Sequence, residues 1–152
     1  MSRLSFRPAT TADLPFMLAL VVADSVGPSD DAGTDPLDAC YLDALAAIDA
    51  DPNQELVIAE LAGEPVGTLQ LTFIPGLMRR GGWRLLVEMV HIVPAQRSRG
   101  LGGEMMEWAH RRGRARGCSL VQLTSNKARL DAHRFYRRLG YQQSHEGFKF
   151  VL

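Results

Sequence analysis

Residues 84–103 read RLLVEMVHIVPAQRSRGLGG, and the architecture of the chain can be worked out from them. The first ten residues are apolar at nearly every position, which predicts a central β-strand covered on both faces. After Pro94, a basic and glycine-rich turn leads into residues 100–116, whose apolar side chains recur at helical spacing. Residues 119–124 form the next strand. A strand, a crossover helix and a second strand imply a parallel pair.

Shorter elements surround this unit. The upstream pattern predicts strands over residues 4–7, 56–61 and 66–74, with helices beginning near Thr10 or Thr11 and after Pro36. The downstream pattern predicts a helix over 132–139 and two short strands, 141–144 and 148–152. The predicted fold class is therefore α+β, with a mixed, mostly antiparallel sheet that has a central parallel pair and is flanked by helices. We expect one domain over residues 1–152.

The composition is ordinary for a globular domain, with 46% hydrophobic and 22% charged residues. No apolar run is long enough to span a bilayer, and no signal peptide opens the sequence. Cys40 and Cys118 make neither a disulfide framework nor a metal-ligand spacing. We expect a cytoplasmic protein with no metal and no membrane partner. A homodimer is compatible with all of these features.

The net charge of zero hides a division between the two halves. Residues 1–76 hold two arginines against twelve carboxylates, whereas residues 77–152 hold fifteen lysines and arginines against five carboxylates. The basic half predicts either an anionic partner or a solvated, basic helix face. A phosphorylated cofactor is favoured over nucleic acid, because the basic residues lack interleaved aromatic side chains on which bases could stack.

The turn after the central strand has the features of a phosphate site. A glycine-rich turn at a helix start leaves backbone N–H groups unpaired, and such groups bind anions. Gly100 and Gly102 remove Cβ atoms so that an anion can approach, while Arg97 and Arg99 add positive charge. The turn matches neither the Walker pattern nor the Rossmann fingerprint. Judged from the glycines alone, the turn could equally be a flexible basic connection between the strand and the helix.

This turn resembles the signature of the GNAT superfamily of acyl-CoA N-acetyltransferases, Gln/Arg-x-x-Gly-x-Gly/Ala, which Arg97, Gly100 and Gly102 fill in register. Glu88 lies where many members carry a glutamate, and residues 132–140 are similar to the family's Ala-x-x-x-Tyr-x-x-x-Gly pattern. The resemblance covers nearly the whole chain. It implies a GNAT-like fold, acetyl-CoA as co-substrate, and direct transfer of the acetyl group to a primary amine of a small molecule in a ternary complex.

The resemblance also implies where the cofactor lies. In the family the sheet opens beside the central strand, often at a bulge, and the pantetheine arm pairs with that strand's edge. The residues that would bind the cofactor are Val90, His91, Ile92, Val93, Arg97, Ser98, Arg99, Gly100, Leu101, Gly102 and Gly103. Asn126 and Arg129 extend this set, since family members often carry an asparagine where this chain has Arg129.

Two residues are candidates for catalysis, because the acceptor amine must lose a proton and the leaving thiolate must gain one. Glu88 is the candidate base, since burial in an apolar strand would raise the pKa of its carboxyl. It could instead bind the acceptor or pair with an arginine. Tyr136 is the candidate acid, because tyrosine is protonated at neutral pH, although its ring could simply fill the core.

The acceptor stays open at this point. Eight aspartates between Asp24 and Asp51 favour a cationic acceptor, or they serve only solubility. The alternatives to a small-molecule enzyme are a protein or peptide acetyltransferase and an acyl-CoA-binding regulatory module without turnover. A regulatory module needs neither Glu88 nor Tyr136, so their joint presence favours the enzyme.

Overall fold

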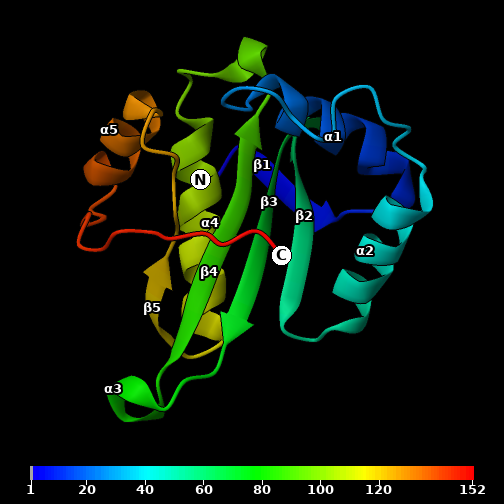
Figure 1. Cartoon of the computed structure of the whole chain (residues 1–152). Coiled ribbons are helices and arrows are strands. Elements are labelled where there is room, and N and C mark those ends of the chain that lie inside the picture. Colours follow the sequence, from blue (N-terminus) through cyan, green and yellow to red (C-terminus); the bar gives the residue numbers. More distant parts are fainter. Residues whose placement is uncertain (1) are drawn as a thin grey trace.

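A computed structural model describes residues 2–152 and shows one five-stranded sheet with helices on both faces (Figure 1). The strands, in their spatial order, are β1 (Leu4–Pro8), β2 (Gln54–Leu61), β3 (Glu64–Ile74), β4 (Trp83–Ile92) and β5 (Cys118–Gln122). All neighbours are antiparallel except β4 and β5, which are parallel. The predicted α+β class with its parallel pair is confirmed.

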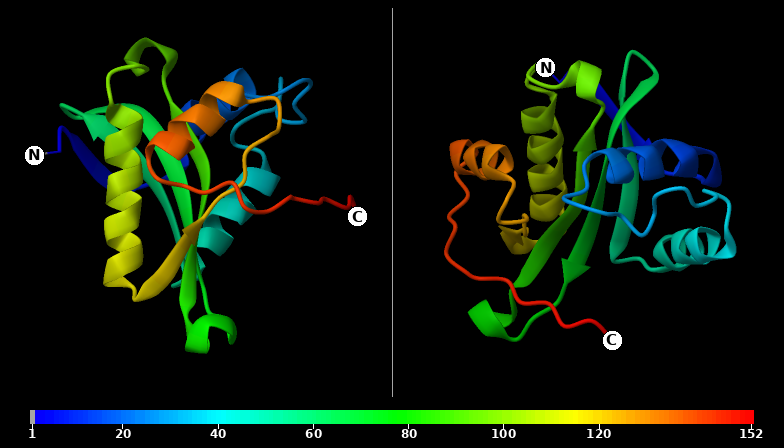
Figure 2. Two further views of the ribbon diagram at one scale, coloured as in Figure 1. Left: turned by 90° about the vertical axis from the view of Figure 1, so that its left-hand side faces the viewer. Right: turned by 45° about the horizontal axis from the view of Figure 1, so that its top comes forward.

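The helices form two layers. They are α1 (Leu14–Ala23), α2 (Ala39–Ala50), the one-turn α3 (Met78–Gly81), α4 (Leu101–Ala115) and α5 (Leu130–Arg138), with 3-10 turns at Thr11–Asp13 and Pro94–Gln96. Helices α1 and α2 lie on one face of the sheet and α4 on the other (Figure 2). No helix within residues 2–152 is both long enough and apolar enough to cross a membrane.

A hydrophobic core fills the space on each side of the sheet. The larger core joins the sheet to α4, where the Leu85 and Met105 side chains are fully buried. The smaller core packs α1 and α2 against β2, with Ile58 and Met17 at its centre. Because β2 packs against helices on both faces and β3 and β4 pack against α4, the edge of β4 that faces β5 has a rigid support.

The start of α1 is fixed by polar contacts as the sequence predicts. The carboxylate of Asp13 accepts hydrogen bonds from the backbone N–H of Thr10 at 2.8 Å and from Arg7 Nη1 at 2.7 Å. The hydrogen bond from Arg7 is the main reason that the pKa of Asp13 lies below its usual value. These contacts fix the start of α1. Asp24, a residue of the candidate site, directly follows the other end of this helix.

A bulge interrupts β4 at Met89. Gln70 of β3 pairs with Glu88 and Thr68 pairs with His91, so two β4 residues lie opposite one residue of β3. Met89 has a φ of 52°, in the left-handed region. Its side chain packs toward α1 and α2, whereas Val90 packs toward α4. The bulge expected in this strand is confirmed, and it re-aims every side chain that follows.

Beside the bulge, the sheet opens. Pairing between β4 and β5 runs from Trp83 and Cys118 to Leu86 and Gln122, and it ends there. From residue 87 onward, this edge of β4 has no strand partner in the described part of the chain. The expected opening between the central strand and the next one is therefore present.

The two short strands predicted over residues 141–144 and 148–152 are wrong. Residues 142–152 form no regular secondary structure and are exposed, and they pair with no strand among residues 2–152. Their alternating pattern suits a strand, but a strand also needs a partner edge. The tail instead leaves α5 and passes in front of β4 (Figure 1). As a consequence, the parallel pair lies at the edge of the sheet.

Gly67 has no side chain, which allows β3 and β4 to approach closely beside the bulge. A Cβ at this position would lie 2.6 Å from the carbonyl oxygen of His91 and 3.0 Å from the sulfur of Met105. We expect Gly67→Ala to lower the free energy of unfolding by about 1–3 kcal/mol, because backbone must shift to admit the methyl group. Urea denaturation measures the loss. Gly147→Ala, with nothing within 4 Å of its Cβ, is the control; equal stability of the two variants would contradict this account.

Candidate active site

The turn between β4 and α4 presents free backbone donors. Ser98 and Gly100 have φ values of 60° and 83°, and α4 begins directly afterwards at Leu101. In residues 2–152, no backbone or side-chain acceptor meets the N–H groups of residues 98–102. These donors lie at the positive end of a helix that runs to Ala115. The turn therefore has the backbone features of an anion site, as predicted.

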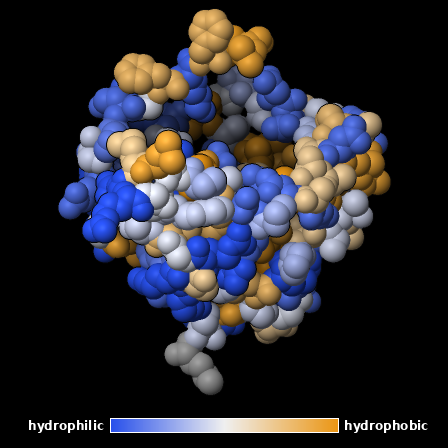
Figure 3. Space-filling model, turned by 90° about the horizontal axis from the view of Figure 1, so that it is seen from below, coloured by the Kyte–Doolittle hydropathy of each residue, from blue (hydrophilic) through white to orange (hydrophobic). Residues whose placement is uncertain are grey.

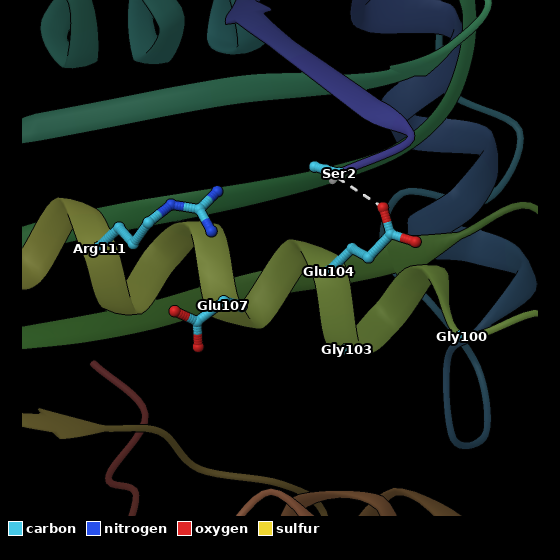
Figure 4. A pocket seen from close by; sticks show the side chains of 6 residues that line it. All are labelled: Ser2, Gly100, Gly103, Glu104, Glu107 and Arg111. Atoms are coloured by element: carbon cyan, nitrogen blue, oxygen red, sulfur yellow. Dashed lines mark hydrogen bonds between the residues drawn. The ribbon is translucent and has the colours of Figure 1, made fainter.

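The N-terminal segment holds this turn from outside. Arg3 donates from Nη2 to the carbonyl of Arg99 at 2.7 Å and from Nε to the carboxylate of Glu104 at 2.6 Å. Figure 4 shows the outer face of α4 at this point, where Ser2 lies beside Glu104 above a shallow hollow. Two glutamates line that hollow. It is therefore poorly suited to an anion, and the free donors of the turn are the better candidate.

Gly102 has a packing role besides its predicted place in the anion site. A Cβ at this position would meet the ring of Phe135 at 3.1 Å and Ile92 at 3.5 Å, so the missing side chain lets α5 pack against α4. Gly100 is needed for its left-handed conformation, which other residues adopt at a cost.

Arg97 also has a different partner from the one expected. Its Nη2 donates to Asp24 Oδ1 at 2.6 Å and its Nε donates to the carbonyl of Ile92 at 3.1 Å. The second oxygen of Asp24 lies 2.7 Å from Nδ1 of His91. Asp24 thus joins the end of α1, the part of β4 after the bulge, and the turn. We call Asp24, His91 and Arg97 the aspartate anchor.

The charge of Asp24 suits this position. Its side chain is only 10% exposed, and burial raises the pKa of the carboxyl. The hydrogen bonds from His91 and Arg97 outweigh burial, so the pKa lies below its usual value. The carboxyl group of Asp24 is therefore charged at neutral pH. Sequence reasoning missed Asp24 because its partners lie far along the chain and no local motif marks it.

A polar surface lies on the sheet face that carries α1 and α2. Glu88 pairs across strands with Gln70, and Gln54 Oε1 accepts hydrogen bonds from Gln70 at 3.1 Å and Thr72 at 2.9 Å. The expectation that Glu88 is buried is wrong, because its side chain is exposed. No helix covers β4 at this height, and among the described residues Glu88 has no ion-pair partner. Its carboxylate can therefore meet a ligand.

Tyr136 lies on α5 among aromatic neighbours. Its ring centroid is 5.1 Å from that of Phe135 and 5.8 Å from that of Tyr141, and Tyr141 in turn shares a hydrogen bond of 2.8 Å with His110 of α4. Burial raises the pKa of the Tyr136 hydroxyl, and the cation of Arg129 partly opposes this rise. The hydroxyl is therefore protonated at neutral pH. The ring fills the core while the oxygen stays a proton donor.

The segment between β5 and α5 borders the opening. Asn126 Oδ1 accepts from the N–H of Ala128 at 2.9 Å, so this side chain shapes the turn before α5. Arg129 lines a cavity of about 480 Å³ together with Arg97 and Arg134. The hydroxyl oxygen of Ser125 is shielded from solvent and has no partner among residues 2–152. A buried hydroxyl of this kind is available to a ligand.

Comparison with known proteins agrees with this geometry. A family model described as "Acetyltransferase (GNAT) family" matches residues 23–141. The chain is 34% identical over 108 residues to an aminoalkylphosphonate N-acetyltransferase of Salmonella typhimurium strain LT2, covering 71% of this chain and 70% of that protein.

Solved structures give the same result for the fold. A transcriptional regulator from Bacillus halodurans C-125 superposes with a TM-score of 0.91 and 40% identity, over 98% of this chain and 99% of that one. A protein of Agrobacterium tumefaciens strain C58, provisionally named an acetyltransferase, superposes with a TM-score of 0.78 and 26% identity, over 97% and 99% of the two chains.

The aspartate anchor leads to a prediction for coenzyme A binding. We expect Asp24→Asn to weaken coenzyme A binding on the order of 10-fold, because the loss of one charge-assisted hydrogen bond of roughly 1.5–3 kcal/mol frees Arg97 and loosens the turn. Isothermal titration calorimetry measures the affinity. Asp30→Asn, an exposed residue of the loop before α2, is the matched control. A folded Asp24→Asn variant with unchanged affinity would show that the anchor does not position the turn.

Proposed function

The chain belongs to the GNAT family of acetyltransferases and is an acetyl-CoA-dependent acyltransferase, and on this premise we propose that it acetylates the primary amine of a small molecule. One observation carries the proposal for the site. The bulged edge of β4 runs without a partner toward a turn whose N–H groups are free. The pantetheine arm of coenzyme A would need an unpaired strand edge, and the pyrophosphate that follows the arm would need free N–H donors next to that edge.

The residues of this opening fit such a ligand. The edge from Val90 to Val93 would pair with the pantetheine amides, as a strand pairs with a sheet edge. The N–H groups of residues 98–102 would receive the pyrophosphate. Arg129 and Arg134, on the wall of the neighbouring cavity, add positive charge near the same ligand. Arg97 acts through the aspartate anchor and holds the turn in place.

Acetyl-CoA supplies the acetyl group as a thioester, which the acceptor amine can take directly. Glu88, on the exposed polar surface, would bind the acceptor's ammonium group and take its proton, directly or through a water molecule. Tyr136 would deliver a proton to the leaving sulfur, since its hydroxyl is protonated at neutral pH. The exposure of Glu88 favours acceptor binding as its first role, because an exposed carboxylate is reached without desolvation.

For the acceptor, the Salmonella relative supplies the first compounds to test. That protein is named for aminoalkylphosphonates, which carry a primary amine on a short chain. On the present chain, Glu88 offers a carboxylate for such an amine, and Gln54, Gln70 and Thr72 offer neutral polar groups for the rest of the molecule. We propose a small polar amine as the acceptor, with aminoalkylphosphonates as the leading class.

The Bacillus halodurans relative raises a second function, since it is described as a transcriptional regulator. A regulatory module would bind acyl-CoA without turning it over. It would have no use for an exposed carboxylate beside the bulge or for a buried tyrosine hydroxyl on α5. The presence of both Glu88 and Tyr136 supports an enzyme. A measurement of turnover distinguishes the two functions.

An amine panel tests the proposal. With acetyl-CoA present, we expect release of free thiol for at least one aminoalkylphosphonate or other small primary amine, and none without acceptor. Glu88→Gln should raise the acceptor KM on the order of 10-fold or more while the affinity for coenzyme A stays unchanged, because a neutral amide holds an ammonium group less strongly. Tight coenzyme A binding with no turnover of any amine would favour the regulatory module.

Tyr136→Phe tests the proton donor. This change removes one oxygen and keeps the ring that packs against Phe135 and Tyr141. We expect kcat to fall by roughly 10- to 1,000-fold, with little change in thermal stability or coenzyme A affinity. Steady-state kinetics under conditions where chemistry limits turnover provide the readout. Full kcat in this variant would leave Tyr136 as a packing residue only.

A further inference from the structure

Helix α5, which carries Tyr136, lies at an edge of the molecule. It lies beside α4 (Figure 1), and none of its nine residues is fully buried. Seen from below, the molecule is hollowed and apolar side chains are visible inside the hollow, so this side is open to solvent (Figure 3). A short peripheral helix is easily displaced unless specific contacts hold it. The direction of the Tyr136 hydroxyl therefore depends on how α5 is attached.

One attachment is apolar and lies at the first turn of α4. The ring of Phe135 packs where Gly102 has no side chain, since a Cβ at that position would lie 3.1 Å from the ring. The ring of Tyr136 meets that of Phe135 edge to face, with the ring centroids 5.1 Å apart. This contact fixes one side of the Tyr136 ring.

The other attachment is polar and involves His110, which lies eight residues after Gly102. That separation is about 12 Å along a helix. Nε2 of His110 lies 2.8 Å from the hydroxyl oxygen of Tyr141. The carboxylate of Glu107 lies 3.7 Å from Nδ1 of the same ring, which favours a proton on Nδ1 and leaves Nε2 to accept from the hydroxyl. Tyr141 thus joins the end of α5 to a second point on α4.

Tyr141 is in turn fixed to Tyr136 by the way in which α5 ends. The N–H of Tyr141 donates to the carbonyl of Tyr136 at 3.1 Å, and the N–H of Gly140 donates to the carbonyl of Arg137 at 3.0 Å. With Gly140 at a φ of 92°, these two bonds make a Schellman motif, which holds the residue after the glycine against the last helical turn. The rings of the two tyrosines also meet, with centroids 5.8 Å apart. A displacement of Tyr141 is therefore transmitted to Tyr136.

We propose that His110 and Tyr141 are positioning residues, whose hydrogen bond fixes the end of α5 on α4 and so directs the Tyr136 hydroxyl at the leaving sulfur. The proposal rests on the proposed function, in which Tyr136 is the proton donor. In that step the O–H bond of Tyr136 breaks, the proton bonds to the thiolate of coenzyme A, and the phenolate then takes a proton from water. Neither His110 nor Tyr141 exchanges a proton with the substrate, so both act only through the position of Tyr136.

Steady-state kinetics of Tyr141→Phe, with acetyl-CoA and the best amine of the panel, test the proposal. This change removes the hydroxyl and keeps the ring and the backbone bonds of the helix end. We expect kcat to fall roughly 10-fold while the acceptor KM and the affinity for coenzyme A stay unchanged, because a misdirected acid slows the chemical step without weakening binding. Tyr41→Phe is the matched control, since it removes from α2 a hydroxyl that donates to Asp31 at 2.7 Å, and it should keep full kcat.

A double variant separates positioning from general packing. In a Tyr136→Phe background, Tyr141→Phe should lower kcat no further, because no hydroxyl remains to be directed. His110→Leu should behave like Tyr141→Phe, whereas His110→Gln, which can still accept a hydrogen bond, should restore most of kcat. Full kcat in Tyr141→Phe, or an equal fall in both backgrounds, would overturn the proposal and leave the role of Tyr136 intact. Full kcat in Tyr136→Phe would overturn the proposed donor and this proposal together.

Hydrogen exchange tests the attachment of α5 without turnover. In Tyr141→Phe and in His110→Leu, the backbone amides of residues 134–141 should exchange roughly 5-fold faster or more than in the wild type, while those of the first turns of α4 stay unchanged. Thermal melting establishes that each variant is folded. Wild-type exchange along α5 in both variants would show that the hydrogen bond does not hold the helix, and would overturn the proposal.

Discussion

The unpaired edge of β4 is the constraint on which the candidate site depends. Parallel pairing with β5 ends at Leu86, and the bulge at Met89 then turns the rest of the strand. A free strand edge inside a folded domain is costly unless a ligand or another strand satisfies it. Here the edge leads straight to the free N–H groups at the start of α4. We propose that an extended, anionic ligand pairs with this edge and with these N–H groups.

Side chains hold the turn between β4 and α4 in place. The aspartate anchor ties the turn to α1 and to β4, and Arg3 ties the same turn to the N-terminal segment and to Glu104. Arg97, a predicted phosphate ligand, and Arg3, which contacts the carbonyl of Arg99, thus both bind carboxylates of the protein. The contacts of Asp24 join a carboxylate of the acidic half to the basic half, whereas the Arg3–Glu104 pair has the opposite polarity.

Sequence reasoning predicted the features that depend on local pattern. The β4–α4 unit and its parallel partner follow from the apolar spacing of the sequence. It failed where the outcome depends on distant parts of the chain. The exposure of Glu88 depends on which helices cover the sheet, and the aspartate anchor joins Asp24 to residues about seventy positions further along the chain. The tail has the pattern of a strand, but the pattern cannot show whether a partner edge is present.

We infer that coenzyme A occupies the opening beside β4 and the turn before α4. Hydrogen exchange of backbone amides, followed with and without coenzyme A, tests this most directly. We expect coenzyme A to slow exchange at the β4 edge from Val90 to Val93 and at residues 98–102, with little change on the outer face of α4. Protection confined to the hollow beside Ser2, Glu104 and Glu107, with none along β4, would contradict it.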